Sequence, residues 1–200
     1  MRLLYTLLEE IWQNAIMKII MGLGNPGKEY EETRHNAGFA LVEYLAKKFS
    51  LALKFDKKFQ AEYVKAEIIK NGVAEDICLI KSMSFMNNSG VTLRAFLDYF
   101  FEEIIKEDEG HHLIVAHDDL DLELGQFKLQ KGKGPKVHNG LSSIYQHLGH
   151  KNFWHLRLGI DSRNGERNIS PSSYVLMKMN QEEKTKLQEV VTEVADSLFS

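Results

Sequence analysis

One histidine, one aspartate and three asparagines stand where a predicted strand or loop gives way to a helix: His35, Asp118, Asn25, Asn87 and Asn139. A histidine held by a carboxylate acts as a general base near neutral pH, because the carboxylate fixes the tautomer of the ring. Neutral amides bind a carbonyl and stabilise the oxyanion that forms when that carbonyl is attacked. These residue types predict hydrolysis of an ester or an amide.

The sequence places no covalent nucleophile beside His35. Cys78 belongs to the apolar run ICLI, and the serines near the candidate residues have no evident activating partner. The start of a helix near His35 favours the neutral imidazole, whereas Asp118 favours the protonated ring, so the two effects predict a base poised near neutral pH. We therefore expect direct attack by water, without a covalent intermediate.

Strands and helices alternate along the chain and must position these residues. Apolar or alternating runs predict strands at 18–21, 59–69, 75–81, 113–116, 125–129 and 154–160. Helical spacing predicts helices at 36–49, 89–101, 141–148 and 181–199. Asn71 and Gly72 predict a two-residue hairpin turn. The pattern predicts an α/β fold with a mixed β-sheet flanked by helices on both faces.

The composition is that of one ordinary globular domain. The chain has 200 residues, of which 44% are hydrophobic and 26% charged, and its net charge is −3. A single cysteine is typical of a reducing compartment, and no apolar run reaches the roughly 20 residues needed to cross a bilayer. We expect a cytoplasmic monomer without a membrane partner.

Residues 1–16 precede the first predicted strand and show helical spacing of leucine, isoleucine and tryptophan. Glu9 and Glu10 argue against a secretory signal or a transit peptide. We interpret this segment as an N-terminal extension, either an amphipathic helix or the product of an upstream start codon. Residues 17–200 then form the catalytic domain.

Gly22, Gly24 and Gly27 spell the dinucleotide-binding pattern G-x-G-x-x-G after the first strand. In that motif a helix begins at once and its free N–H groups hold a pyrophosphate. Here Pro26 removes one N–H group, and the polar stretch KEYEETRHN delays the amphipathic helix. The glycines therefore favour a loop that exposes Asn25 and leads to His35.

Four ordered segments, GLGNPGKEYEETRHNAGF, KSMSFMNNSG, HDDLDLELGQFKL and HNGLSSI, resemble the bacterial-type peptidyl-tRNA hydrolases. The resemblance runs from Met17 to about Met179. It implies a single α/β domain with a twisted mixed sheet, and an enzyme that cleaves the ester between a peptide and the 3′ ribose of tRNA. It implies no metal and no cofactor.

By this resemblance His35 is the catalytic base and Asp118 is the carboxylate that orients it. Asn25 and Asn87 match amides that bind the peptide backbone and the reacting carbonyl, and Asn139 matches an amide that positions substrate and water. The remaining positions expected to contact substrate or tRNA are Tyr30, Met86, His138, Lys128, Lys131, Lys133 and Arg157. Lysines at these positions would bind the RNA backbone with little sequence readout.

The chain departs from the family pattern near the expected tRNA surface. Ser82 replaces a proline, and the segment from Lys133 to Val137 interrupts a glycine-rich run. A second basic position is Gln130, although Lys131 is next to it. Because valine resists positive φ, the loop before His138 cannot copy a glycine-glycine conformation.

Two other functions compete with this interpretation. The altered loop and the N-terminal extension favour an RNA-binding relative that has lost or repurposed its hydrolase activity. The histidines and acids between 111 and 121 raise the possibility of a metallohydrolase with ligands among His111, His112, His117, Asp118, Asp119 and Asp121. Adjacent residues on a strand point to opposite faces, so only part of that run can converge on one ion.

Overall fold

The computed structural model describes residues 17–70, 72–102, 113–165 and 168–199, and a mixed seven-stranded sheet lies at its centre. The strands follow the order β2-β3-β4-β1-β5-β7-β6 across the sheet. Their bounds are β1 Met17–Gly22, β2 Lys54–Asp56, β3 Ala61–Lys70, β4 Val73–Ser82, β5 Leu113–Glu123, β6 Phe127–Lys131 and β7 Trp154–Asp161. The α/β class and the mixed sheet predicted from the sequence are therefore confirmed.

The four central strands, β4, β1, β5 and β7, run parallel, and the strands at both edges are antiparallel to their neighbours. Apart from Lys18, which pairs with Glu75, strand β1 has the apolar sequence of a strand covered on both faces, and five of its six residues are buried. It lies between β4 and β5, which follow it in the chain. The chain adds β4 on one side of β1 and then crosses to add β5 on the other, and such a reversal of strand order opens a crevice at the carboxyl ends of the strands.

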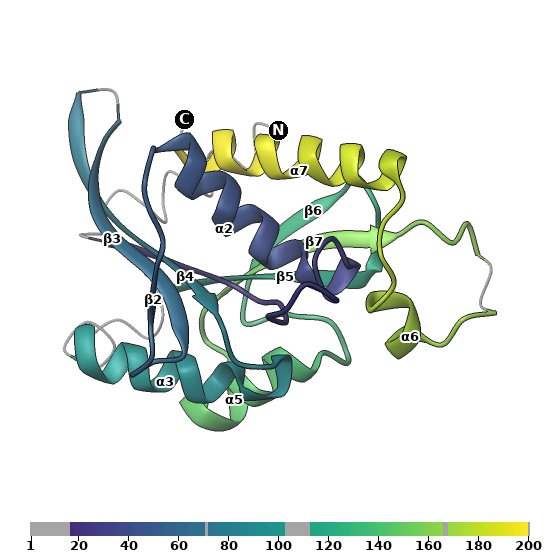
Figure 1. Cartoon of the computed structure of the whole chain (residues 1–200), viewed down its shortest axis with the longest axis horizontal. Coiled ribbons are helices and arrows are strands. Elements are labelled where there is room, and N and C mark those ends of the chain that lie inside the picture. The colour runs from purple at the N-terminus through teal and green to yellow at the C-terminus, as the bar shows by residue number, and fades with distance from the viewer. Residues whose placement is uncertain (1–16, 71, 103–112, 166–167, 200) are drawn as a thin grey trace.

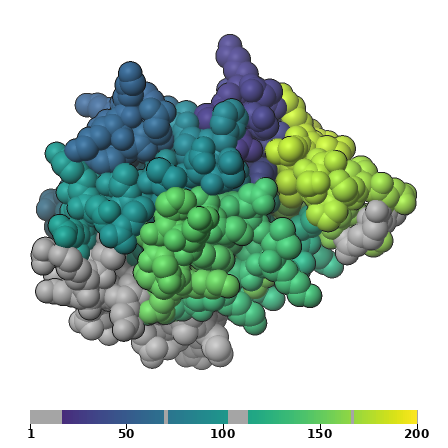
Figure 2. Space-filling view, turned by 90° about the horizontal axis from the view of Figure 1, so that it is seen from below, coloured from purple at the N-terminus to yellow at the C-terminus, as the bar shows by residue number. Residues whose placement is uncertain are grey.

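Helices cover both faces of the sheet (Figure 1). The helices α2 (Ala37–Lys48) and α7 (Gln181–Phe199) pack on one face, and α3 (Ser89–Phe100) and α5 (Asn139–Leu148) pack on the other. Figure 2 shows this second face, with α5 in green beside α3 in teal. Each face has its own cluster of buried apolar side chains, so the sheet is enclosed between two cores. No helix of the described ranges is long and apolar enough to span a bilayer.

Most predicted elements are present with shifted ends, and two short ones were missed. The helix expected at 36–49 is α2, and a 3₁₀ turn, η1 (Arg34–Asn36), precedes it. Strand β2 and the helix α6 (Pro171–Val175) were not predicted, because three and five residues are too short to show a period. The extension at 1–16 and the pair His111 and His112 lie outside the described residues.

Strand β5 is longer than its apolar run predicts. It continues past Ala116 because His117, Asp118 and Asp119 pair with Arg157, Leu158 and Gly159 of β7. Asp118 therefore lies within a strand of the sheet, where its backbone is fixed on the side of β7, instead of in a loop after the strand.

The N-terminal end of α2 rests directly on the sheet at Gly38. A Cβ atom on Gly38 would lie 2.3 Å from the carbonyl oxygen of Ala116 and 2.5 Å from the amide nitrogen of Leu23. Both atoms belong to backbone that is itself hydrogen-bonded, Leu23 N–H to Ala116 C=O at 2.9 Å. Only glycine allows this approach, and the approach brings the residues before α2 close to Asp118.

We expect Gly38→Ala to lower the free energy of unfolding by about 3 kcal/mol, because the added methyl group has no space and its neighbours are backbone atoms. Denaturant unfolding measures this loss. Lys47→Ala, at an exposed position of the same helix, is the matched control, for which we expect a change within about 0.5 kcal/mol. Equal stability of the two variants would show that α2 can move away from the sheet.

Candidate active site

A buried histidine–aspartate pair lies where η1 meets strand β5. His35 Nδ1 is 2.8 Å from Asp118 Oδ1, and the two residues are 8% and 2% exposed. The carboxylate can only accept, so Nδ1 carries the proton and Nε2 is left with a free lone pair. The described residues offer Nε2 no hydrogen-bond partner. The structure therefore brings His35 and Asp118 into the contact that the predicted roles of the two residues require, and the roles themselves stay predictions.

A second histidine, His138, shares the same carboxylate oxygen. Its Nε2 lies 3.1 Å from Asp118 Oδ1, and the rings of His35 and His138 have centroids 5.0 Å apart. His138 is the N-cap of α5, and its Nδ1 accepts the backbone N–H of Leu141 at 3.3 Å. Because Nδ1 accepts a hydrogen bond, Nε2 must carry the proton that His138 donates to Asp118. His138 therefore holds Asp118, although the sequence predicted it as a substrate contact.

Opposing effects set the charges of this pair. Burial acts to raise the pKa of Asp118. The electrostatic attraction of His35 and His138 for the carboxylate, together with the hydrogen bonds that both rings donate, outweighs burial and holds that pKa well below its usual range. Burial lowers the pKa of His35, but the negative charge of Asp118 and its hydrogen bond outweigh burial and leave the pKa of His35 above 6.5. The aspartate is thus ionised throughout the range in which His35 titrates.

The two other histidines in this region belong to the interior. Burial, together with the neighbouring His138, lowers the pKa of His117 well below 6.5. Burial likewise lowers the pKa of His155 to about 4. Both rings are fully buried and are weaker bases than a free imidazole, so His35 is the candidate base.

His35 and Asp118 open onto a crevice of about 430 Å³. The loop before α5 contributes Lys136 and Val137 to one wall, and α5 itself contributes Asn139. Val137 is 84% exposed at the rim. The unpredicted helix α6 forms the facing wall with Pro171, Ser172 and Val175. The crevice therefore brings together His35, Asp118 and Asn139 of the predicted catalytic set.

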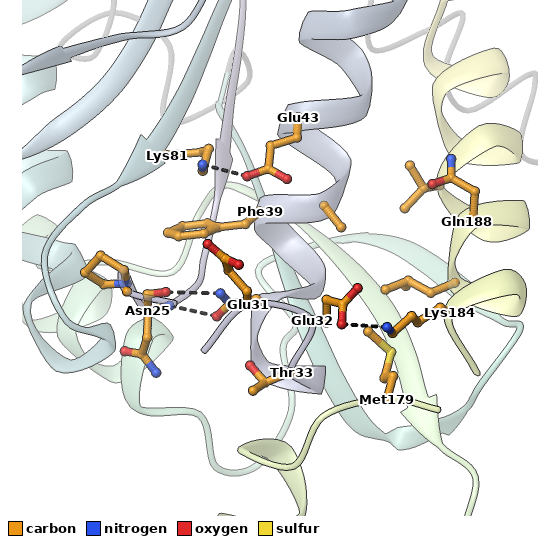
Figure 3. Close-up of a pocket in the computed structure, with 16 residues that line it drawn as sticks. Asn25, Glu31, Glu32, Thr33, Phe39, Glu43, Lys81, Met179, Lys184 and Gln188 are labelled. Carbon is orange, nitrogen blue, oxygen red and sulfur yellow. Dashed lines mark hydrogen bonds and ion pairs between the residues drawn. The ribbon is translucent and has the colours of Figure 1, made fainter. Parts of the chain in front are cut away.

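Asn25 is joined by a reciprocal pair of hydrogen bonds to Asn36, the residue after His35. The backbone N–H of Asn25 donates to Asn36 Oδ1 at 2.8 Å, and Asn36 Nδ2 donates to the carbonyl of Asn25 at 3.0 Å (Figure 3). Asn25 Oδ1 accepts the backbone N–H of Met86 at 2.8 Å, which leaves the side-chain NH₂ to donate. Sequence reasoning missed Asn36, whose only signal was its place after His35 in TRHN.

Asn25 borders a separate pocket of about 410 Å³ between α2 and α7, shown in Figure 3.

Asn87 belongs to the short 3₁₀ helix η2 (Met86–Asn88) and is exposed, whereas Met86 is 4% exposed. Tyr30 is half-buried and meets the exposed ring of Phe85 edge-on, with centroids 6.2 Å apart. Asn25, Asn87 and Tyr30 do not line the crevice at His35, so their contacts with substrate stay predictions.

The predicted tRNA contacts differ in accessibility. Lys128 is exposed on the edge strand β6, Lys133 is exposed in the loop that follows, and Lys131 is half-buried. Arg157 is 7% exposed, and its guanidinium donates to Asp119 at 2.6 Å and to Gln130 at 2.7 Å. The structure thus gives Arg157 a role inside the sheet, and its contact with a phosphate stays a prediction.

The substituted loop before His138 avoids the conformation of a glycine-rich run. Gly132 has φ +65°, and no residue from Lys133 to Val137 has a positive φ. Lysine, proline and valine adopt this course without backbone strain. The chain can therefore present His138 and Asn139 at the start of α5 despite the departure from the family pattern.

The structure also limits the metal alternative. Asp119 is paired with Arg157, and His117 Nδ1 bonds the backbone carbonyl of Asp118 at 2.9 Å. Within the described ranges, one group could hold an ion: His35, Asp118 and His138, whose ligand atoms lie within 4.8 Å of one another. The nitrogens that would bind a metal there are the ones that donate to Asp118, so hydrogen bonding and metal binding use the same atoms.

A helix-covered mixed sheet with a histidine–carboxylate pair open to a crevice is the arrangement of a histidine-dependent hydrolase. The sequence model of the family described as peptidyl-tRNA hydrolase matches residues 19–200. This chain belongs to the peptidyl-tRNA hydrolase family, as the resemblance of its four motifs implied.

Individual relatives agree with the family assignment. The peptidyl-tRNA hydrolase of Synechococcus elongatus is 40% identical over 176 residues, covering 86% of this chain and 80% of the relative. That of Neisseria meningitidis is 40% identical over 175 residues, covering 88% and 85%. A crystal structure of peptidyl-tRNA hydrolase from Acinetobacter baumannii superimposes with a TM-score of 0.75 at 34% identity, covering 90% of this chain and 85% of the other.

Proposed function

We propose that this protein hydrolyses the ester between a peptide and the 3′ ribose of tRNA, with His35 as the general base. The observation that carries the assignment of the base is the 2.8 Å hydrogen bond from His35 Nδ1 to Asp118, which directs the lone pair of Nε2 away from the carboxylate. The crevice that His35 lines has room for a carbonyl and a water. The identification of the substrate as peptidyl-tRNA is inferred from the family to which the chain belongs.

In the proposed reaction His35 Nε2 takes a proton from water while the water oxygen bonds to the ester carbon. The carbonyl π electrons move to oxygen, and the resulting oxyanion accepts hydrogen bonds from side-chain amides, of which Asn139 lines the crevice. When the tetrahedral intermediate collapses, the bond to the ribose oxygen breaks and that oxygen takes the proton from His35. The products are the free peptide acid and tRNA with a 3′ hydroxyl.

Asp118 remains a carboxylate throughout this cycle and stabilises the imidazolium that forms at His35. Asn25 and Asn87 are assigned to the peptide backbone and the reacting carbonyl. In support, the NH₂ group of Asn25 is available to donate, and Asn87 follows the Met86 amide that holds Asn25. No step requires a metal or a cofactor.

Single-turnover cleavage of an N-acetylated aminoacyl-tRNA, measured with and without a chelator, tests the proposed reaction. We expect equal cleavage in both conditions. Loss of cleavage with the chelator would favour a metal at His35, Asp118 and His138. A folded protein that binds tRNA without cleaving it would instead favour the RNA-binding alternative.

We further propose that the acceptor stem of the tRNA lies along the lysine-bearing edge formed by β6 and the loop before α5. Lys128 and Lys133 are exposed there, and the loop leads directly to the crevice. A flexible ammonium group binds phosphate as a point charge without reading sequence. The proposal includes action as a cytoplasmic monomer.

We expect Lys128→Ala to weaken tRNA binding and to reduce the slope of log K against log salt by about 1, because one phosphate contact is lost. Filter binding or fluorescence anisotropy at several salt concentrations measures the slope. Lys47→Ala on α2, which covers the opposite face of the sheet, is the control and should leave the slope unchanged. Equal slopes for all three proteins would place the phosphates elsewhere.

A further inference from the structure

The residue before His35 is a buried arginine that contacts the C-terminal part of the chain. Arg34 is 6% exposed, and its Nη2 donates to Glu183 Oε1 at 2.6 Å. Its Nη1 donates to the carbonyl of Met177 at 3.2 Å, and its guanidinium stacks on the ring of Tyr174 at 4.2 Å. A planar guanidinium can make all three contacts at once.

The backbone around Arg34 is joined to the same C-terminal segment. The N–H of Arg34 donates to the carbonyl of Met177 at 3.3 Å, and the N–H of Met179 donates to the carbonyl of Glu32 at 3.0 Å. Thr33 and Lys178 form the bridge between them. Figure 3 shows Thr33 and Glu32 facing Met179 and Lys184 across this junction. The chain that carries His35 is therefore attached to the segment between α6 and α7.

Tyr174 connects this junction to the facing wall of the crevice. Its hydroxyl donates to the carbonyl of Ile160 at 3.2 Å and accepts the backbone N–H of Ser162 at 3.1 Å, so α6 is anchored to the end of β7. The next residue, Val175, lines the crevice opposite the loop before α5. Arg34 thus lies between the residue that carries the base and the helix that forms the wall.

The turn that carries His35 has little structure of its own to fix the ring. It is a three-residue 3₁₀ helix, and Thr33 makes no side-chain capping hydrogen bond. On one side of His35, Asn36 is held by Asn25, and on the other side Arg34 is held by Glu183 and Met177. The position of the imidazole relative to Asp118 depends on these two neighbours.

We propose that Arg34 is a positioning residue, which through Glu183, Met177 and Tyr174 sets the distance of His35 from Asp118 and from the α6 wall of the crevice. This inference rests on the proposed role of His35 as the base. Arg34 does not touch the reacting atoms. Its loss slows the chemical step because the ring no longer holds one position, and small misplacements of a catalytic group are costly.

The test compares Arg34→Lys and Arg34→Met with the parent protein. We expect kcat to fall by about 10- to 100-fold in Arg34→Met, while KM stays within about twofold of the parent value. We expect a smaller fall in kcat for Arg34→Lys, because lysine keeps the positive charge but lacks the planar set of N–H donors of the guanidinium. NMR titration of the His35 ring should also give a lower midpoint, since a longer distance to Asp118 removes the effect that raises its pKa. The other groups facing the ring or its crevice are His138, Asp121 and Lys136.

Glu183 is itself 6% exposed, so Arg34→Met leaves a buried carboxylate without its cation. The double variant Arg34→Met/Glu183→Gln removes both charges, and it replaces Arg34→Met in the kinetic and NMR measurements if the single variant does not fold. Arg94→Met, which breaks an exposed pair with Asp98 on α3, is the matched control. All measurements are made well below the melting temperature of each variant.

Unchanged kcat and an unchanged His35 midpoint in a folded Arg34→Met or double variant would overturn the inference, even if the melting temperature fell, because Arg34 would then serve stability alone. His35→Ala is assayed in parallel. Full activity of His35→Ala would refute the proposed base itself, whereas the NMR midpoint reports on the position of the ring independently of turnover.

Discussion

His35→Ala is expected to lose about 10²- to 10⁴-fold in kcat, the range that general-base catalysis typically contributes. The variant keeps the crevice, Asn139 and the lysine-bearing edge, so KM and tRNA binding should change little. The residual rate comes from positioning and from the amides that stabilise the oxyanion. Single-turnover cleavage of N-acetylated aminoacyl-tRNA measures the loss, and circular dichroism checks the fold.

The matched control is His147→Ala, which removes an exposed histidine of α5 outside the crevice and should leave kcat unchanged. In His35→Ala the carboxylate of Asp118 keeps its hydrogen bond from His138, so the variant is expected to fold. Wild-type turnover by folded His35→Ala would assign the base to another residue.

Asp118→Asn is expected to lower kcat/KM by about a hundredfold or more at neutral pH. The amide has one oxygen to accept hydrogen bonds, and its NH₂ group repels the N–H groups of His35 and His138 if the side chain turns over. The negative charge that stabilises the imidazolium is also lost. Asp98→Asn, at an exposed position on α3, is the control and should match the parent protein.

The same variant should move the pH dependence in a defined direction. The base must be neutral, so the rate of the parent protein rises with pH through a midpoint above 6.5, where the charge of Asp118 has placed the pKa of His35. Without that charge, burial dominates and the pKa of His35 falls below 6.5, so the acid limb of the rate profile shifts to lower pH. A profile of Asp118→Asn that coincides with that of the parent would mean that Asp118 does not control the base.

The raised pKa of His35 has a consequence for stability as well. A folded-state pKa above the unfolded value means that the protonated ring is favoured in the native protein. The contribution of the His35–Asp118 pair to stability is therefore fully present below pH 6.5. It is lost as the pH rises through the folded-state pKa of His35.

The shared oxygen of Asp118 explains why the loop before α5 tolerates its unusual residues. His138 is fixed at both ring nitrogens, one by the α5 backbone and the other by Asp118. The position of Asn139 then follows from the start of α5, whatever course the chain takes from Lys133 to Val137. The substitutions in that segment affect the rim of the crevice and leave the contact between His138 and Asp118 in place.

The sequence by itself determined the fold class, the order of the main elements and the two members of the candidate pair, His35 and Asp118. Largely apolar runs such as 18–21 predict buried strands, and helical spacing predicts α2, α3, α5 and α7. These patterns are local, because the alternation of buried and exposed positions repeats within a single strand or helix. The family resemblance came from four ordered motifs, one of which contains His35.

Only the tertiary structure decided which residues meet. That His138 shares the oxygen of Asp118, that Asn36 holds Asn25, and that Arg34 reaches Glu183 depend on packing between segments up to 149 positions apart. It also placed Arg157 in an ion pair with Asp119 and revealed α6 as a wall of the crevice. Such contacts leave no periodic signal in the sequence, since each arises from one pair of side chains that the fold brings together.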